Sequence, residues 1–133
     1  MTKERLKEYR ALKHEEAQLE QELRELLESS YIGGVVLDGM PKAGGLGDIT
    51  SKLACETVML YGRLNKKKLE AVRMRNEIED CFEILDAEER TLMREKYIYG
   101  KNWEQVCIVV NVSWRTAHRI HIVALKKLEA MVP

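Results

Sequence analysis

The hydrophobic positions in the first part of the chain have the spacing of one long helix. Residues 2–29 contain neither glycine nor proline, and leucine recurs every seven residues at Leu12, Leu19 and Leu26. Such a repeat predicts an amphipathic helix with coiled-coil character. Glu16 occupies one of the positions that would face a partner helix, and its charge weakens that seam.

Glycine is concentrated in the segment that follows. Six of the eight glycines in the chain, and one of its two prolines, lie between Gly33 and Gly47. This composition predicts a loop from about residue 31 to about residue 48. The glycines lack the spacing of a phosphate-binding loop, so we expect a structural or partner-contacting segment and no bound nucleotide or other cofactor.

A second long helix is predicted to begin near Asp48 or Thr50, which are candidate N-caps, and to run to about Ile84. One apolar stripe follows it, formed by Leu53, Leu60, Leu64, Ala71, Ile78 and Leu85. Two long helices joined by a loop fold back most simply as an antiparallel helical hairpin, residues 1–84. Its leucine stripes exceed what one hairpin covers, so we expect this part to make the chain a homo-oligomer, a dimer.

Residues 85–133 show short helical patterns separated by residues that start and stop helices. Asp86 followed by Glu89 predicts a capped helix start, and Gly100 suits the end of that helix. Asn102 is the expected cap of a short helix over residues 103–110. We expect this C-terminal part to be a domain that folds on its own.

The last helix is predicted to follow a tight turn. Asn111 ends the preceding helix, because asparagine tolerates a positive φ, and Ser113 caps a helix from 114 to about 131. Two helices separated by a turn of three to four residues predict a helix-turn-helix, whose second helix enters a DNA major groove. The whole chain is therefore expected to be all-α.

The apolar period of the last helix separates its two faces. The inward-facing residues are expected to be Ala117, Ile120, Ala124 and Leu128, and the outward-facing ones Trp114, Arg115, His118, Arg119 and Ile122. Arg115 and Arg119 lie four residues apart near the start of the helix, where a reading helix reaches base edges. We interpret both as readers of guanine, and Lys126 and Lys127 as phosphate contacts.

The net charge changes this picture in one respect. The 22 basic residues are balanced by 22 acidic ones, which is unusual for a nucleic-acid-binding protein. Residues 111–128, however, contain four Lys or Arg, two His and no acid. The positive charge is therefore local, and we expect modest affinity from one subunit, with a dimer or another protein supplying the remainder.

The remaining chemistry narrows the class of protein. Three widely spaced cysteines indicate reduced thiols, and no apolar run has the length of a membrane span, so we expect a cytoplasmic protein in a bacterial host with no membrane partner. His118 and His121 have metal-ligand spacing but no further ligands near them in the sequence, so we expect no metal site. No nucleophile–base pair is recognisable, and an enzyme is not expected.

The residues of the C-terminal part also carry a family resemblance. They are Leu85, Asp86, Glu89, Arg90, Leu92, Arg94, Tyr97, Ile98, Gly100, Trp103, Glu104, Gln105, Val106, Asn111, Val112, Ser113 and residues 124–128. This pattern resembles region 4 of bacterial sigma factors, and residues 119–128 are similar to small phage-encoded late-gene regulators of the RinA and ArpU kind. Ile122 and Val123 stand where basic residues are common in those families.

The resemblance implies a sequence-specific DNA-binding regulator of phage or prophage late genes, with double-stranded DNA as its partner. The expected DNA contacts are Ser113, Trp114, Arg115, Thr116, His118, Arg119, Lys126 and Lys127. Two alternatives stay open. The same helices could form a protein-interaction module that contacts host RNA polymerase or another phage protein, or belong to a DNA-recognising packaging subunit.

Overall fold

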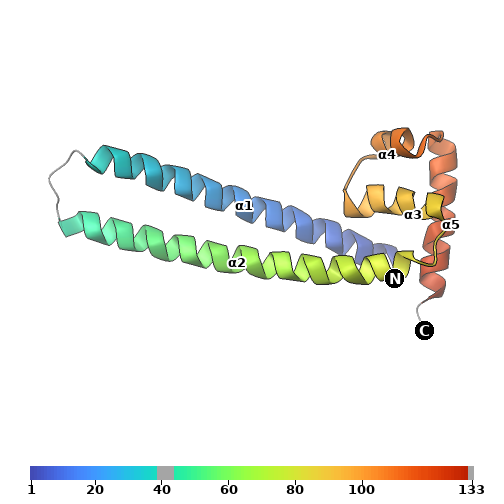
Figure 1. Ribbon diagram of the computed structural model, residues 1–133, viewed down its shortest axis with the longest axis horizontal. Coiled ribbons are helices and arrows are strands. Elements are labelled where there is room, and N and C mark those ends of the chain that lie inside the picture. Colours follow the sequence, from blue (N-terminus) through green and yellow to red (C-terminus); the bar gives the residue numbers. More distant parts are fainter. Residues whose placement is uncertain (39–43, 132–133) are drawn as a thin grey trace. The chain divides into compact units, whose positions relative to one another are not determined.

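Every regular element in the described part of the chain is a helix, which confirms the all-α prediction. The computed structural model describes the backbone of residues 1–38 and 44–131 and the side chains of residues 1–29 and 51–131. Its elements are α1 (Lys3–Asp38), α2 (Gly44–Phe82), α3 (Ala87–Met93), the π-helical turn η1 (Arg94–Ile98), α4 (Trp103–Val110) and α5 (Trp114–Ala130) (Figure 1). Within these residues no helix combines the length and the apolar character needed to cross a membrane.

The two long helices extend further than their glycine content indicates. α1 continues to Asp38 and α2 begins at Gly44, so the prediction of a loop is wrong for residues 31–38 and 44–48, while residues 39–43 lie outside the described part. Asp48 and Thr50 consequently lie inside α2 and do not cap it. A glycine inside a helix costs only about 0.5–1 kcal/mol and keeps its backbone hydrogen bonds, so isolated glycine pairs do not end a helix.

The chain divides into two compact units. The first comprises residues 1–13 and 70–133, and the second comprises residues 14–69. Both α1 and α2 therefore contribute to both units. This division differs from the expected boundary between residues 84 and 85, because the C-terminal helices share a core with the first turns of α1 and the last turns of α2.

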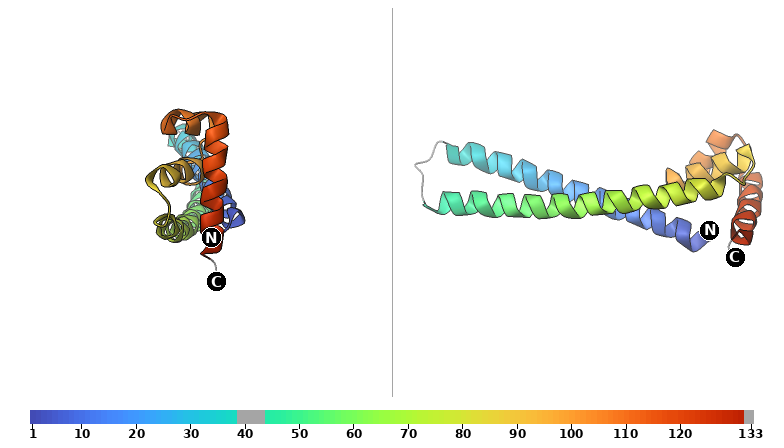
Figure 2. Two further views of the ribbon diagram at one scale, coloured as in Figure 1. Left: turned by 90° about the vertical axis from the view of Figure 1, so that its right-hand side faces the viewer. Right: turned by 60° about the horizontal axis from the view of Figure 1, so that its bottom comes forward.

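The second unit consists of the neighbouring parts of α1 and α2, which run antiparallel to each other (Figures 1 and 2). Leu23 and Leu64 are buried in the described part of this unit. Ion pairs join the two helices, with Lys67 Nζ 2.9 Å from a Glu15 oxygen and Lys68 Nζ 3.2 Å from a Glu20 oxygen. All four charged side chains are partly exposed, so these pairs add little stability and mainly match the two helices in register.

The first unit has a single hydrophobic core to which five helices contribute. Its largest fully buried side chains are Phe82, Leu6, Ile78, Leu92, Met93, Leu128 and Val106, which come from α1, α2, α3, α4 and α5. Burial of one such side chain contributes about 1.5–3 kcal/mol. Met1 and the end of α5 are neighbours in Figure 2, and the Met1 nitrogen lies 3.4 Å from the Leu128 carbonyl oxygen.

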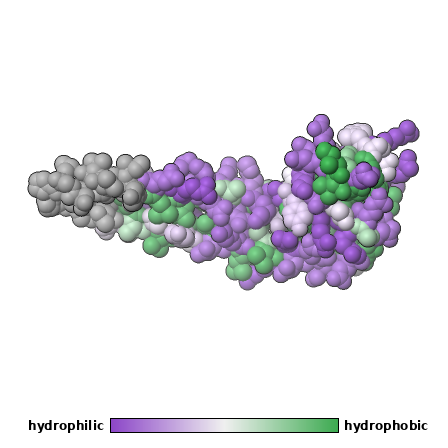
Figure 3. Space-filling model, turned by 45° about the horizontal axis from the view of Figure 1, so that its top comes forward, coloured by the Kyte–Doolittle hydropathy of each residue, from purple (hydrophilic) through white to green (hydrophobic). Residues whose placement is uncertain are grey.

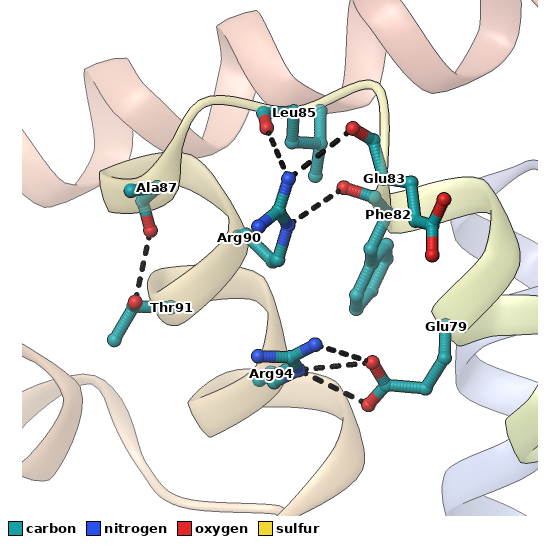
Figure 4. A network of polar contacts seen from close by, with 8 residues as sticks. All are labelled: Glu79, Phe82, Glu83, Leu85, Ala87, Arg90, Thr91 and Arg94. Atoms are coloured by element: carbon teal, nitrogen blue, oxygen red, sulfur yellow. Dashed lines mark hydrogen bonds and ion pairs between the residues drawn. The ribbon is translucent and has the colours of Figure 1, made fainter.

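Two arginines of the first unit hold the end of α2 against α3 and η1 (Figure 4). Arg90 donates hydrogen bonds to the carbonyl oxygens of Phe82, Glu83 and Leu85 at 3.0–3.2 Å. Arg94 donates to both carboxylate oxygens of Glu79, the shortest distance being 2.7 Å. The last carbonyl groups of a helix have no partner within the helix, and Arg90 supplies one for them.

Candidate nucleic-acid interface

The segment that leads into α5 has the predicted turn. Asn111 ends α4 in the left-handed conformation, with φ 58° and ψ 49°. Ser113 caps α5, since its hydroxyl accepts a hydrogen bond from the Thr116 nitrogen at 3.2 Å and lies 3.0 Å from the Thr116 hydroxyl. The expected caps Asn102 and Asp86 are also present, as is the left-handed Gly100, with φ 68°. Local capping signals thus position both α4 and α5.

The faces of α5 are largely as the apolar period predicts. Ala117, Ala124 and Leu128 are completely buried, and Ile120 packs against the core. Arg115, Arg119 and Lys126 are exposed on the opposite face. None of these three cations makes an ion pair with a carboxylate in the part of the chain that the structure describes, which leaves their donors available to an anion.

His118 is an exception, because it does not point freely outward. Its ring lies between two tryptophans, with centroid distances of 4.1 Å to Trp103 and 3.9 Å to Trp114. The Nε2 atom of His118 is buried and has no hydrogen-bond partner among the described residues. His118 therefore does not lie free on the exposed face, because two aromatic rings cover part of it. Its contact with DNA stays a prediction.

His121 is buried in the core of the first unit. Its Nε2 atom lies 2.7 Å from the Tyr97 hydroxyl, and its ring makes an edge contact with Trp103 at 4.9 Å. Burial, followed by the positive charge of Lys3, lowers the pKa of His121 to about 4. Burial also raises the pKa of Tyr97 to about 12. The phenol therefore keeps its proton at neutral pH and can donate it to the uncharged imidazole.

Lys127, expected to be a phosphate contact, is partly exposed and paired with carboxylates of α3 and its N-cap. Its Nζ lies 2.8 Å and 2.9 Å from the two carboxylate oxygens of Glu89, and 3.7 Å from an oxygen of Asp86. The hydrogen bonds to Glu89 raise the pKa of the Lys127 ammonium. Lys127 thus joins α5 to the start of α3, and its ammonium group is already paired with a carboxylate. Its role as a phosphate contact stays a prediction.

Apolar side chains are exposed beside the basic face. Ile108 is 79% exposed, Trp114 61% and Ile122 52%, and Val109 adds to them. Figure 3 shows apolar areas bordered by hydrophilic ones over the C-terminal helices. Large exposed apolar side chains in a group mark a surface that contacts another molecule.

Two further residues, Trp103 and Glu89, contact α5 in a way that no pattern in the sequence predicts. Trp103 covers His118, and Glu89 holds Lys127, across separations of 15 and 38 residues. Both partners become neighbours only through packing. Among the described residues, no group of three or more His, Cys, Asp or Glu side chains could hold a metal ion.

Comparison with protein-family models, curated proteins and solved structures found no match for this chain.

Proposed function

We propose that the chain is a sequence-specific DNA-binding transcriptional regulator, in which α4, the turn at residues 111–113 and α5 form a helix-turn-helix. The observation that supports this most directly is the exposed pair Arg115 and Arg119 in the first two turns of α5, without carboxylate partners among the described residues. The first residues of a reading helix are those that reach base edges in a major groove. Arginine can donate two hydrogen bonds to one guanine.

The distribution of charge supports the same assignment. The stretch from Asn111 to Leu128 contains no acid, and with Lys127 paired, Lys126 is the lysine of α5 placed to contact phosphate. Three available cations give weak electrostatic attraction to DNA. Two copies of the reading helix bound to one DNA molecule would raise the overall affinity through avidity and so compensate for the weak attraction of a single copy.

A second copy of the chain can be held by the helical hairpin that we propose for α1 and α2. α2 exposes Val58, Met59, Tyr61 and Leu69, which are between 47% and 70% exposed. Val58 and Leu69 are eleven residues apart and therefore lie on one face of the helix. A helix face of this kind buries its apolar surface when two copies associate, so the proposed regulator is a dimer.

The biological role within this class follows from the resemblance of residues 85–133 to sigma factor region 4 and to phage late-gene regulators. On that basis the proposed targets are promoters of phage or prophage late genes. The sign of regulation depends on where the operator lies relative to the promoter.

The test begins with selection of bound duplexes from a random pool by the full chain. Fluorescence anisotropy then compares the selected and a random duplex, at a stated salt concentration, for Arg115→Ala, Arg119→Ala and the control Arg63→Ala, an exposed arginine of α2. Loss of a bidentate contact to guanine costs about 1–3 kcal/mol. We expect both α5 variants to lose discrimination between the duplexes and the control to keep it.

The proposal fails if both α5 variants keep specific binding while circular dichroism shows an intact fold. Lys126→Ala provides a further check, because a phosphate contact is insensitive to sequence. This substitution should lower the affinity for the selected and the random duplex by the same factor. It should also reduce the salt slope of binding by about one.

A protein partner is the second candidate, favoured by the exposure of Ile108 and Trp114. In that case the surface of α4 and α5 binds host RNA polymerase, and DNA contact is incidental. Ile108→Asp would then abolish binding to purified polymerase, whereas Arg119→Ala would leave it unchanged. The opposite pattern would favour the DNA-reading function.

A further inference from the structure

A cationic pocket lies within the first unit, and its lining includes neither Arg115 nor Arg119. Its volume is about 390 Å³, near the lower end of the range for ligand-binding pockets. Five of the nine residues that line it are basic, and none is acidic. These are Lys3, Lys7, Arg10, Lys96 and Lys101.

The basic side chains reach the pocket from two separate parts of the chain. Lys3, Lys7 and Arg10 recur at intervals of four and three residues, which places them on one face of α1. Lys96 belongs to η1, and its Nζ lies 5.0 Å from the centre of the Trp103 ring. Arg10 donates a hydrogen bond to the Ile98 carbonyl at 2.9 Å, which fixes α1 against η1. This contact holds the two groups of lysines on neighbouring elements.

The positive charges in the pocket are poorly compensated. Lys101 pairs with Glu95 at 2.6 Å, but Lys3, Lys7 and Lys96 form no ion pair in the described part of the chain. Burial, and then the charges of Arg10 and Lys3, lower the pKa of Lys96. Like charges gathered in a concave site repel one another, and a bound anion would offset that repulsion.

We propose that this pocket binds a phosphate group, held by the ammonium groups of Lys3 and Lys7 from α1 and of Lys96 from η1. A phosphate group presents several strongly accepting oxygens in different directions, so ammonium groups from two helices can bind it together. A carboxylate presents its two oxygens in one plane and is less suited to donors that approach from two helices. The phosphate can belong to a DNA backbone or to a free phosphate compound. The site is separate from the proposed reading face and does not depend on it.

The first arm of the test uses inorganic pyrophosphate as the probe, with ionic strength held constant by sodium chloride. A ligand that binds only the folded state raises the midpoint of thermal unfolding in a saturable way. We expect such a rise for the full-length protein, and an apparent dissociation constant at least fivefold weaker for Lys3→Gln with Lys7→Gln. The control, Lys52→Gln with Lys66→Gln, removes the same charge from exposed positions of α2.

The second arm measures binding to a random-sequence duplex as a function of salt. If the phosphate is that of DNA, the double variant at residues 3 and 7 lowers the salt slope by about one relative to the control, because the pocket neutralises one phosphate. If it is a free compound, the slope is unchanged and only the response to pyrophosphate is lost. Each of these results supports the pocket and identifies the source of the phosphate.

The proposal is overturned if the double variant matches its control in both arms. Lys7→Glu gives an independent variant at an exposed position, where a changed side chain leaves the core intact, and it should weaken binding more than Lys7→Gln. Circular dichroism of each variant confirms the fold. Because Arg115 and Arg119 are untouched, failure of this site and failure of the reading helix are separate outcomes.

Discussion

His121 and Lys127 of α5 both have their polar groups paired with other side chains of the protein, His121 in the core and Lys127 at the partly exposed surface. His121 meets the Tyr97 hydroxyl in the core, and Lys127 meets Glu89 at the start of α3. In both cases the partner belongs to a different helix of the first unit. The Tyr97 hydroxyl and the His121 ring are removed from water and need each other, because leaving such a group unpaired costs about 1–3 kcal/mol.

The pKa of His121 gives the first unit a defined pH dependence. It falls from the ordinary value of 6.5 to about 4 on folding, so between these values the unfolded chain binds more protons than the folded one. Stability is therefore fully present above about pH 6.5 and decreases as the pH falls towards 4, by about 2–3 kcal/mol. Urea unfolding from pH 4 to 7 should show this decrease for the natural protein.

His121→Gln provides the comparison, since glutamine can accept the hydrogen bond from Tyr97 but does not titrate. Its loss of stability over the same pH interval should be smaller by about that amount. Identical pH profiles for the two proteins would show that His121 does not titrate differently in the folded state.

Substitutions of Lys126 and Lys127 are expected to affect different properties, DNA affinity for Lys126 and folding stability for Lys127. Lys127→Ala leaves the buried carboxylate of Glu89 without its ammonium partner, so the midpoint of thermal unfolding should fall. Lys126→Ala changes an exposed, unpaired side chain and should shift stability by no more than about 0.5 kcal/mol, while it weakens DNA binding. Equal unfolding midpoints for the two variants would argue against the structural role of Lys127.

At the scale of the elements, residues in left-handed backbone conformations separate the short helices between residues 87 and 130. Gly100 and Asn111 have positive φ, and a Cβ at Gly100 would overlap the Arg10 guanidinium. The π-helical turn η1 precedes Gly100, with the Tyr99 nitrogen bonded to the Arg94 carbonyl at 3.0 Å. These features fix the directions of α4 and α5, and with them the direction of the proposed reading face.

Asn111 tests the turn between α4 and α5 directly. Its side chain is exposed, so substitution changes the backbone preference more than the packing. Alanine at a left-handed position costs about 1–2 kcal/mol, whereas glycine adopts this conformation without strain. We expect chemical unfolding to show a loss of that size for Asn111→Ala and almost none for Asn111→Gly. An alanine variant as stable as the natural protein would mean that the turn is not left-handed in solution.

On the scale of the whole molecule, the first unit draws its core from both ends of the chain. Leu6 and Tyr9 of α1 and Ile78 and Phe82 of α2 are at most 2% exposed, and they belong to the same core as Leu92 and Leu128. Residues 85–133 therefore do not contain all the apolar surface that their helices need to bury. Independent folding of residues 85–133 stays an untested expectation, and the shared core argues against it.

A fragment of residues 84–133 should consequently be much less helical than the same segment in the full chain. Its circular dichroism is the measurement, and a helical, cooperatively unfolding fragment would show that α1 and α2 are dispensable for the core. In the full chain, Phe82→Ala should lower stability by about 3–5 kcal/mol, because the residue is fully buried.

Assembly is also a property of the whole molecule. The proposed dimer should appear in equilibrium sedimentation of the full chain at micromolar concentration. Val58→Glu with Leu69→Glu places charges on the exposed apolar face of α2 and should give a monomer. Lys52→Gln with Lys66→Gln, which shifts the net charge by the same amount, should remain dimeric. A monomeric natural protein would remove avidity as the compensation for its low local charge.

The sequence by itself determined the features that depend on neighbours a few residues away. The caps Asp86, Asn102 and Ser113 and the left-handed Gly100 and Asn111 were all predictable, because each satisfies or redirects backbone groups within one helical turn. The inward face of α5 was predictable for the same reason, since its apolar period follows from helix geometry.

The tertiary structure alone decided which side chains meet across the fold. The contacts of Lys127 with Glu89, of His121 with Tyr97 and of His118 with Trp103 link residues that are between 15 and 38 positions apart. The cationic pocket joins the start of α1 to η1. Such contacts depend on how complete helices pack together, and burial stabilises any well-matched apolar face whatever its position in the chain. A local pattern therefore predicts that a face is buried, but not what covers it.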